Sequence, residues 1–366
     1  MKDLIRAHAG LLFAGIATFV MMGAGQALFG PVLPVYVRDF SPTEGEAGLF
    51  VALLWVGCFL GVGLMYFNGA AIGPRHTLAV MAAGAGGMAA SPTWALTLAG
   101  AVVFGMGYGM ATAVFNPGVM RAFGAKGPSM LSLLNATFGV GAIAAPLAFV
   151  WLGSDPAWAF GLVAVAILVI WVFAGPAGAE SAAPPGQVAA FRPHWAILGF
   201  GLVAIGMEAS LAGLGPTALI RAGVEEQRAA RLLSAFFVVF LLARVGLIFI
   251  AHRVQAFVLY TVAVTSAAAF ALGAVFLSPS VFFVAMGASA GVFFPGFYVT
   301  ASGKMGEDLR VPPTIVASGL AGAIGAPLIL APLSAGMGER GFFVLVASLL
   351  LATSAAAILS LRRMKV

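Results

Sequence analysis

Two ionisable residues, Glu208 and Arg244, lie inside long apolar segments of the chain. Charged side chains cost about 2.5–3.5 kcal/mol at the centre of a membrane helix on insertion scales, so their presence needs a reason. Glu208 follows His194 by about fourteen residues, which places it near the middle of its segment at a rise of 1.5 Å per residue. A carboxylate held away from water favours its protonated form and can switch with its surroundings. We therefore predict that Glu208 binds a proton or a solute, the alternative being a permanent structural bond to Arg244 or to backbone donors.

Arg244 precedes His252 by eight residues and is expected near the cytoplasmic end of its segment. It could pair with Glu208, bind an anionic solute, or act as a structural tie between helices. The sequence leaves these three roles open, and we expect a gating or supporting role.

Polar side chains near the middle of other apolar segments form a second set of candidates. Gln26 and Tyr108 lie at a depth similar to that of Glu208, and Ser289 is a further candidate. We predict that these side chains bind a solute together with Glu208. The alternative is that they form hydrogen bonds between helices, each worth under about 2 kcal/mol.

Asn116 and Asn135 lie within about ten residues of the basic stretch that runs from Arg121 to Lys126. The pair Asn116–Pro117 predicts a helix break, because proline removes a backbone donor. Asn135 could satisfy the freed backbone or could contact a solute. We expect a gating or supporting role for both asparagines.

The composition excludes several classes of protein. Of the 366 residues 62% are hydrophobic and 8% are charged, and the mean hydropathy is +1.08. About a quarter of the residues of a soluble domain are charged, so a soluble enzyme and a nucleic-acid-binding protein are both excluded. The single cysteine, Cys58, excludes an internal disulfide framework and a cysteine metal cluster. No nucleophile–base pair, metal-ligand spacing or phosphate loop is recognisable, so we expect no enzymatic activity, cofactor or metal, and we read the methionines as core residues.

Continuous apolar windows predict an all-α membrane protein, since a helix needs about 20 apolar residues to span the hydrocarbon and satisfies its own backbone. Twelve windows are present, and the one at 77–91 is the weakest because it is short. They lie at 10–37, 47–69, 77–91, 94–118, 129–151, 156–174, 195–220, 230–251, 256–277, 281–302, 313–336 and 341–361.

The distribution of positive charge predicts the orientation. With both termini in the cytoplasm, most of the lysines and arginines fall on the cytoplasmic side, and most of the acidic residues fall outside. We therefore expect a multi-pass protein of the plasma membrane, such as a bacterial inner membrane. The net charge of +6 is an orientation signal and requires no nucleic acid.

A central hydrophilic stretch divides the chain into two similar halves. Residues 175–193 are rich in Pro, Gly and Ala and predict a cytoplasmic linker. The predicted domains are thus a six-helix bundle over 1–174 and another over 194–366. Three features recur about half a chain apart: Gln26 with Pro34 as Glu208 with Pro216, Pro117–Gly118 as Pro295–Gly296, and Gly141 to Leu147 as Gly322 to Leu328.

Twelve helices, a central linker and an internal duplication resemble the major facilitator superfamily over essentially the whole chain. Within it, residues 131–147 (LSLLNATFGVGAIAAPL) and 206–219 (GMEASLAGLGPTAL) are similar to the fucose–galactose–gluconate proton symporter group. The resemblance implies two halves that alternate access to a central cavity lined by the first, fourth, seventh and tenth helices.

One segment departs from the superfamily pattern. The loop after the second helix usually carries an aspartate in the form G-x-x-x-D-R-x-G-R-R, but here it reads from Asn68 to His76 with Ala70 in place of the aspartate. The usual charge-relay control of the inward gate is therefore not expected.

The helix count and the internal duplication predict a secondary transporter that acts as a monomer in the lipid bilayer. The resemblance to the symporter group implies that its substrate is a small organic solute, such as a sugar or related nutrient. With no ATP-binding loop present, protons are the expected coupling ion, through Glu208. The sparse polar set leaves a proton-antiport exporter of amphipathic drugs or metabolites as an alternative. A membrane assembly or sensing protein that shares the fold without transporting is the alternative from another class.

Overall fold

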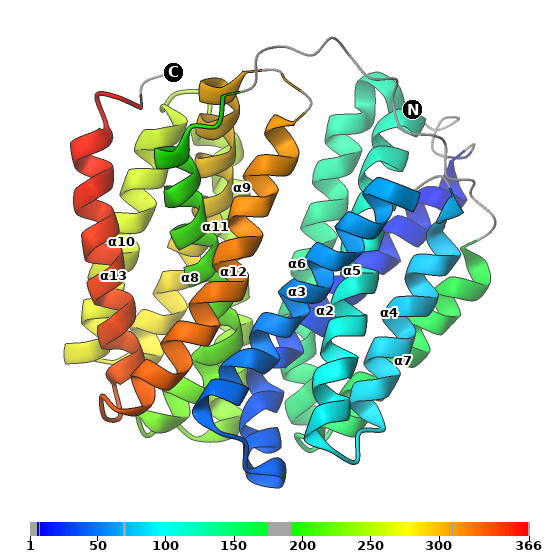
Figure 1. Ribbon diagram of the computed structural model, residues 1–366, viewed down its shortest axis with the longest axis horizontal. Helices are drawn as coiled ribbons and strands as arrows, with labels where there is room; N and C mark the ends of the chain where they lie inside the picture. The colour runs from blue at the N-terminus through cyan, green and yellow to red at the C-terminus, as the bar shows by residue number, and fades with distance from the viewer. Residues whose placement is uncertain are drawn as a thin grey trace. The chain divides into compact units, whose positions relative to one another are not determined.

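The computed structural model describes residues 6, 8–68, 71–174, 192–306, 308 and 310–364, and these residues form helices without a strand (Figure 1). Most of the predicted linker and Ala70 lie outside the described residues. The long helices are α2 (Ala9–Phe40), α3 (Glu44–Asn68), α4 (Pro74–Ala89), α5 (Trp94–Phe123), α6 (Gly127–Trp151), α7 (Pro156–Phe173), α8 (Trp195–Arg221), α9 (Glu226–Ile250), α10 (Ala256–Phe276), α11 (Pro279–Met305), α12 (Val311–Ala335) and α13 (Gly341–Ser360).

Each predicted window corresponds to one of these twelve helices, so the prediction of an all-α membrane protein is confirmed. Eleven of the helices are long and apolar enough to cross a membrane. The remaining one is α4, which has 16 residues and matches the window predicted to be the weakest.

The chain forms two compact units. Unit 1 comprises residues 1–42 and 53–183, and unit 2 comprises residues 43–52 and 184–366. The first residues of α3 therefore group with unit 2, where Glu44 forms an ion pair with Arg221 at the end of α8.

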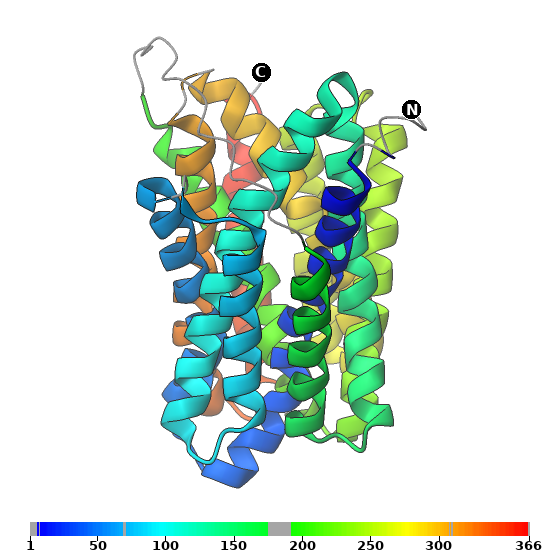
Figure 2. The same cartoon turned by 90° about the vertical axis from the view of Figure 1, so that its right-hand side faces the viewer.

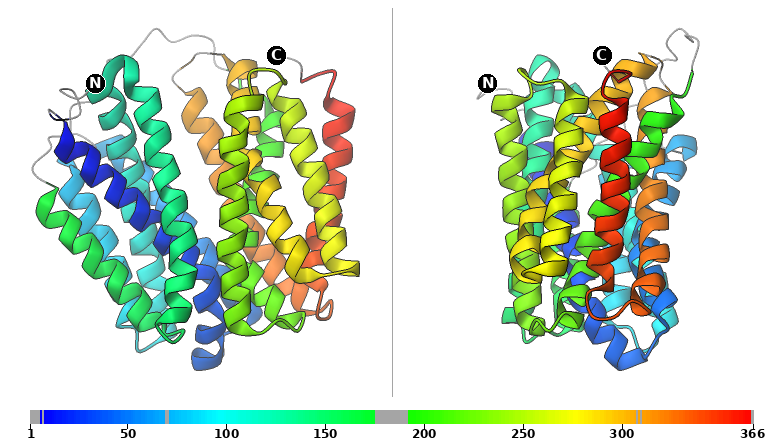
Figure 3. Two further views of the ribbon diagram at one scale, coloured as in Figure 1. Left: turned by 180° about the vertical axis from the view of Figure 1, so that it is seen from behind. Right: turned by 90° about the vertical axis from the view of Figure 1, so that its left-hand side faces the viewer.

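The two units repeat the same packing of helices. In unit 1, α2 packs against α6, and α4 packs against both α5 and α7, as Figure 2 shows for α4 and α5. In unit 2, α8 packs against α12, and α10 packs against α11 and α13, the last drawn in red in Figure 3. Three helix pairs of unit 1 thus recur six helices later in unit 2, which agrees with the predicted duplication.

Matched glycines bring the paired helices into backbone contact. A Cβ added to Gly141 of α6 would overlap the carbonyl oxygen of Val20 in α2, and one added to Gly23 would overlap that of Phe138. In unit 2, a Cβ on Gly322 of α12 would overlap the carbonyl oxygen of Leu202 in α8. Small residues let membrane helices approach this closely, and both units use them at the same crossing.

Two pairs of glycines spaced four residues apart also face a neighbouring helix. Gly57 and Gly61 of α3 lie against the backbone of α5, and Gly105 and Gly109 of α5 lie against the backbone of α3. The structure therefore explains these spacings as close helix packing within unit 1.

The predicted helix break at Asn116–Pro117 is wrong, because α5 continues through Pro117 to Phe123. Proline removes one donor from the helix ladder, but a membrane helix tolerates this loss where neighbouring helices and local adjustment compensate for it. The same holds for Pro295, which lies inside α11.

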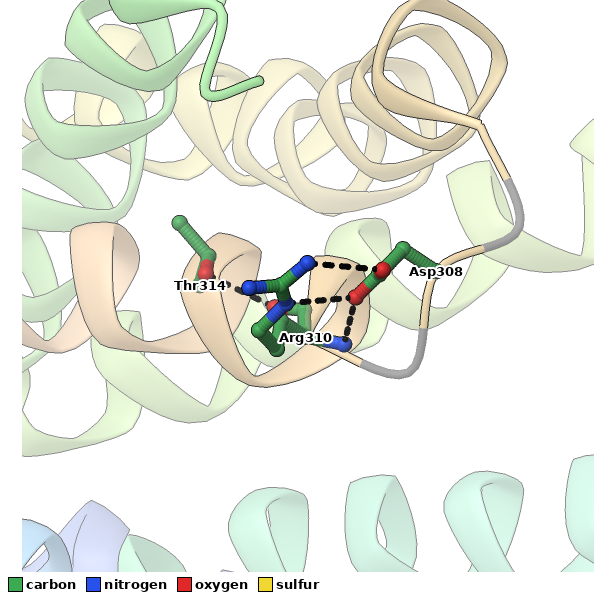
Figure 4. Close-up of polar contacts among 3 residues, drawn as sticks. All are labelled: Asp308, Arg310 and Thr314. Carbon is green, nitrogen blue, oxygen red and sulfur yellow. Dashed lines mark hydrogen bonds and ion pairs between the residues drawn. The ribbon is translucent and has the colours of Figure 1, made fainter. Parts of the chain in front are cut away.

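A carboxylate organises the turn that starts α12 (Figure 4). Asp308 accepts hydrogen bonds from the backbone N–H and the Nε of Arg310 on Oδ1, at 2.9 and 2.8 Å, and from Nη2 on Oδ2 at 2.9 Å. The hydroxyl of Thr314 donates to the Arg310 carbonyl at 2.7 Å. The hydrogen bonds from Arg310 hold the pKa of Asp308 down at about 2.

Candidate functional site

Glu208 lies at the middle of α8 and faces Arg244 of α9. The Arg244 Nη2 is 3.9 Å from the Glu208 Oε1, which is a long ion pair. The side chains are 22% exposed for Glu208 and 30% exposed for Arg244. The predicted pairing of these two residues is therefore present in the structure, at a distance that leaves the carboxylate loosely held.

The second oxygen of Glu208 is distinctive because Oε2 is buried and has no hydrogen-bond partner. A buried acceptor without a partner costs about 1–3 kcal/mol, and more when the group is charged. A proton on this oxygen would lower that cost by removing the charge. The local geometry thus suits a carboxyl group that changes its protonation state.

Arg244 has two further contacts, one with α11 and one within α9. Its Nε donates to the carbonyl oxygen of Gly291 in α11 at 3.2 Å, and its guanidinium lies 4.3 Å from the centre of the Phe240 ring. A cation over an aromatic face is attracted by the ring quadrupole. The guanidinium is therefore anchored on α9 and α11 and reaches toward α8.

In unit 1, Gln26 of α2 and Tyr108 of α5 are joined directly. The Tyr108 hydroxyl donates to the Gln26 Oε1 at 3.0 Å, and Gln26 is 9% exposed. Trp55 of α3 and Phe138 of α6 present their rings at steep angles to that of Tyr108, with centroids 6.1 and 6.5 Å away. The Gln26 amide and the Tyr108 hydroxyl thus lie in a cluster with the rings of Trp55, Tyr108 and Phe138, called the unit 1 cluster below.

The two clusters occupy equivalent places in the repeat, since Gln26 and Glu208 lie on the first helix of each half. In unit 1 the position holds a neutral amide bonded to a tyrosine. In unit 2 it holds a carboxylate facing an arginine. The duplication has kept the position polar in both halves and made it ionisable in only one.

Two of the other predicted site residues, Ser289 and Asn135, have local partners. The Ser289 hydroxyl is 2.8 Å from that of Ser266 in α10 and is buried, so it joins two helices. Asn135 donates to the carbonyl of Leu131 in its own helix at 2.9 Å. Asn116 has a buried Oδ1 without a hydrogen-bond partner. Because Ser289 and Asn135 already bond to neighbouring groups, we leave both out of the proposed site.

Two residues of the unit 1 cluster, Trp55 and Phe138, are missing from the sequence-based prediction. Trp55 lies in the second apolar window and could have been noticed as a tryptophan far from the membrane–water interface, where this residue is usually found. Nothing in the sequence signals that Phe138 faces Tyr108, because the chain has 30 phenylalanines and this one has no distinguishing neighbour. Among the described residues, no three His, Cys, Asp or Glu side chains gather in a way that could hold a metal ion.

Solved structures share this arrangement of helices. A nucleoside transporter, NupG, matches with a TM-score of 0.77 at 12% identity, covering 95% of this chain and 99% of that one. A D-xylose–proton symporter matches with a TM-score of 0.72 at 12% identity over 94% and 96% of the two chains. The transporter FucP in its outward conformation matches with a TM-score of 0.65 at 16% identity over 97% and 98%. At these identities the likeness shows the fold.

Comparison with curated proteins found no match. A family model described as Major Facilitator Superfamily matches residues 15–312, and the twelve helices and repeated packing agree with it. The chain therefore belongs to the Major Facilitator Superfamily.

Proposed function

We propose that this protein is a proton-coupled secondary transporter of a small organic solute, such as a sugar or related nutrient, working by alternating access. The observation that carries the proposal is Glu208, a carboxylate at the middle of a membrane helix with one long ion pair and one unpartnered oxygen. Membrane helices keep such residues when they bind ions or protons.

Glu208 would act by gaining and losing one proton per cycle. Protonation removes its charge and weakens its attraction to Arg244, whereas deprotonation restores the pair. A proton crossing 100 mV supplies about 2.3 kcal/mol, which is enough to accumulate a neutral solute about 50-fold. One carboxylate is therefore sufficient to drive uptake.

Gln26 and Tyr108 are the residues that we propose contact the solute. Their amide and hydroxyl groups offer donors and acceptors, and the rings of Trp55, Tyr108 and Phe138 offer apolar contact. Sugars match this combination, because their hydroxyls need hydrogen bonds and their C–H faces pack on aromatic rings. The similar structures of a D-xylose–proton symporter and a nucleoside transporter are consistent with a solute of this size.

The excess of aromatic rings over polar groups in the unit 1 cluster favours a second candidate. An amphipathic drug or metabolite would gain more from three rings than from one amide and one hydroxyl. Such a solute would leave the cell in exchange for protons. Glu208 would carry the proton in both cases, so only the solute and its direction differ.

We further propose a monomer in the plasma membrane, such as a bacterial inner membrane, with both chain ends in the cytoplasm. The excess of lysine and arginine on one set of connections supports this orientation. Eleven spanning helices and one shorter helix support the multi-pass placement.

Transport into proteoliposomes tests the proposal. Purified protein is given D-xylose, L-fucose, uridine and the amphipathic cation ethidium, each with and without an imposed gradient of about one pH unit. We expect gradient-driven movement of at least one probe, limited to about tenfold accumulation for one proton per solute. Glu208→Gln should abolish this accumulation while solute exchange continues.

Tyr108→Phe serves as the matched variant, because it removes only the hydroxyl that bonds Gln26. We expect it to weaken solute binding and leave the response to the pH gradient in place. Unchanged gradient-driven accumulation in Glu208→Gln would remove proton coupling through this residue. If ethidium is the only probe that moves, the substrate is an amphipathic solute and the proposed nutrient is ruled out.

A further inference from the structure

A proline in α11 leaves one backbone carbonyl in need of a donor. Pro295 lies inside the helix and has no N–H, so the carbonyl four residues earlier, that of Gly291, lacks its usual helical partner. Uncompensated carbonyls of this kind are costly inside a membrane. The structure supplies a replacement donor from another helix.

The replacement is Arg244, whose Nε donates to the Gly291 oxygen at 3.2 Å. Glycine at this position brings the two helices close together, because a Cβ on Gly291 would crowd the carbonyl oxygen of Phe240 in α9. No side chain at residue 291 therefore stands between the guanidinium and the carbonyl. The sequence feature that makes this bond necessary is the proline, and the feature that makes it possible is the glycine.

The same guanidinium reaches a second acceptor, since its Nη2 lies 3.9 Å from the Glu208 carboxylate. The bond to α11 is well formed, and the ion pair to α8 is long. A charged Glu208 pulls the guanidinium toward α8, and a neutral Glu208 leaves it to the Gly291 carbonyl. Arg244 thus interacts with two acceptors, the Gly291 carbonyl and the Glu208 carboxylate. The charge on Glu208 decides how strongly the guanidinium is drawn to each of them.

We propose that Arg244 is a positioning residue that couples the charge on Glu208 to the conformation of α11 at Pro295. The inference rests on the proposed function, in which Glu208 gains and loses the coupling proton. When Glu208 is neutral, the bond from Arg244 stabilises the carbonyl freed by the proline. When Glu208 is charged, that hydrogen bond weakens, and α11 is less stable near Pro295.

The other ionisable groups on the surrounding helices lie mostly near helix ends. On α8 and α9 they are Arg221, Glu226, Arg228 and Arg231. On α10, which packs against α11, it is Tyr260, and on α11 they are Tyr298 and Lys304. The described residues of α12 and α13 include no ionisable side chain. Arg244 is therefore the cation through which the charge on Glu208 can reach α11.

A double-mutant cycle on thermal stability tests the inference without any transport assay. The cycle combines Arg244→Lys, which keeps the charge but loses the planar fork, with Pro295→Ala, which gives the Gly291 carbonyl a helical donor again. Pro295→Ala makes the bond from Arg244 redundant, so the two changes should be non-additive by at least about 1–2 °C in melting temperature. Arg244→Gln provides a second cycle that also removes the charge.

The cycle is then repeated in the Glu208→Gln protein, where residue 208 is always neutral. We expect the non-additivity to grow, because the guanidinium is no longer shared. Additive changes in both backgrounds would show that Arg244 does not support α11. Equal non-additivity in the two backgrounds would show that Glu208 has no influence on the contact, and either result overturns the inference.

A pH profile separates positioning from simple structural support. In solute exchange by the proteoliposomes, Arg244→Gln should move the pH midpoint upward by about one unit or more, because a neighbouring positive charge is lost. Arg244→Lys should keep the midpoint near that of the wild type. Non-additivity that depends on residue 208, found together with unchanged accumulation in Glu208→Gln, would refute the proposed function and leave the coupling of Arg244 to α11 standing.

Discussion

At the scale of single residues, Gln26 and Glu208 occupy the same place in the two repeats, but only Glu208 can lose a proton. Gln26 is satisfied by a neutral hydroxyl at 3.0 Å, whereas Glu208 has a cation at 3.9 Å and one oxygen without a partner. An amide in the place of Glu208 would preserve the shape and remove the charge. This is why glutamine is the informative substitution at residue 208.

Asp308 offers a pH-dependent prediction outside the membrane helices. Its pKa in the folded protein is about 2, below the value of about 3.9 for an unfolded chain. A lowered pKa means that the folded protein is stabilised above about pH 4 and that this contribution disappears as the pH falls toward about 2. Asp308→Asn should therefore lower the melting temperature by a few degrees at pH 7 and by progressively less as the pH drops from about 4 toward 2.

Melting curves of the wild type and Asp308→Asn at pH 7, 5 and 3 check this expectation. Thr314→Val is a suitable control, because it removes a neighbouring hydroxyl that donates to the Arg310 carbonyl but carries no charge. Its effect should not depend on pH. An Asp308→Asn difference that stays constant from pH 7 to 3 would contradict the assigned role of the carboxylate.

At the scale of helices, the crossing of α2 and α6 depends on glycine. A Cβ at residue 141 would overlap the carbonyl oxygen of Val20, which is backbone and cannot rotate away. Gly141→Ala should therefore force the helices apart and destabilise the protein by about 1–3 kcal/mol. Thermal melting of the purified protein measures this loss.

Gly86→Ala in α4 is the matched control, since a Cβ there would meet no atom within 4 Å. Alanine is favoured over glycine inside a helix by roughly 0.5–1 kcal/mol, so this variant should melt at the wild-type temperature or slightly above it. Equal losses in the two variants would mean that the close approach of α2 and α6 has no special importance.

The helices could be predicted from the sequence, but their partners could not. Apolar length alone located α8 and α12, because each must span the hydrocarbon. Which faces meet depends on backbone shape, and a pair such as Gly206 and Gly322 has meaning only once the helices are side by side. The predicted break at Pro117 failed for a related reason, since the sequence of α5 does not show that the helix continues despite the lost donor.

The candidate site was predictable only where a polar residue stands out against an apolar background. Glu208, Arg244, Gln26 and Tyr108 meet that condition. The Gly291 carbonyl does not meet it, because every residue has a backbone carbonyl. Only Pro295 indicates that this one lacks its helical donor. The partner of Ser289 was equally hidden, since serine is common in helix contacts and in binding sites alike.

At the scale of the whole molecule, orientation in the membrane can be measured directly. In a Cys58→Ala background, a cysteine at Glu339, between α12 and α13, should react with a membrane-impermeant maleimide in intact cells. A cysteine at Gln255, between α9 and α10, should react only after the cells are broken. Both positions are exposed, so access to the reagent depends on the membrane. The reverse pattern of labelling would invert the proposed topology.

The short helix α4 has a consequence for the lipid around unit 1. Its 16 residues span about 24 Å at 1.5 Å per residue, whereas the hydrocarbon core is about 30 Å thick. The mismatch must be absorbed by local thinning of the bilayer or by the residues that flank the helix. Thin membranes should therefore suit this protein better than thick ones.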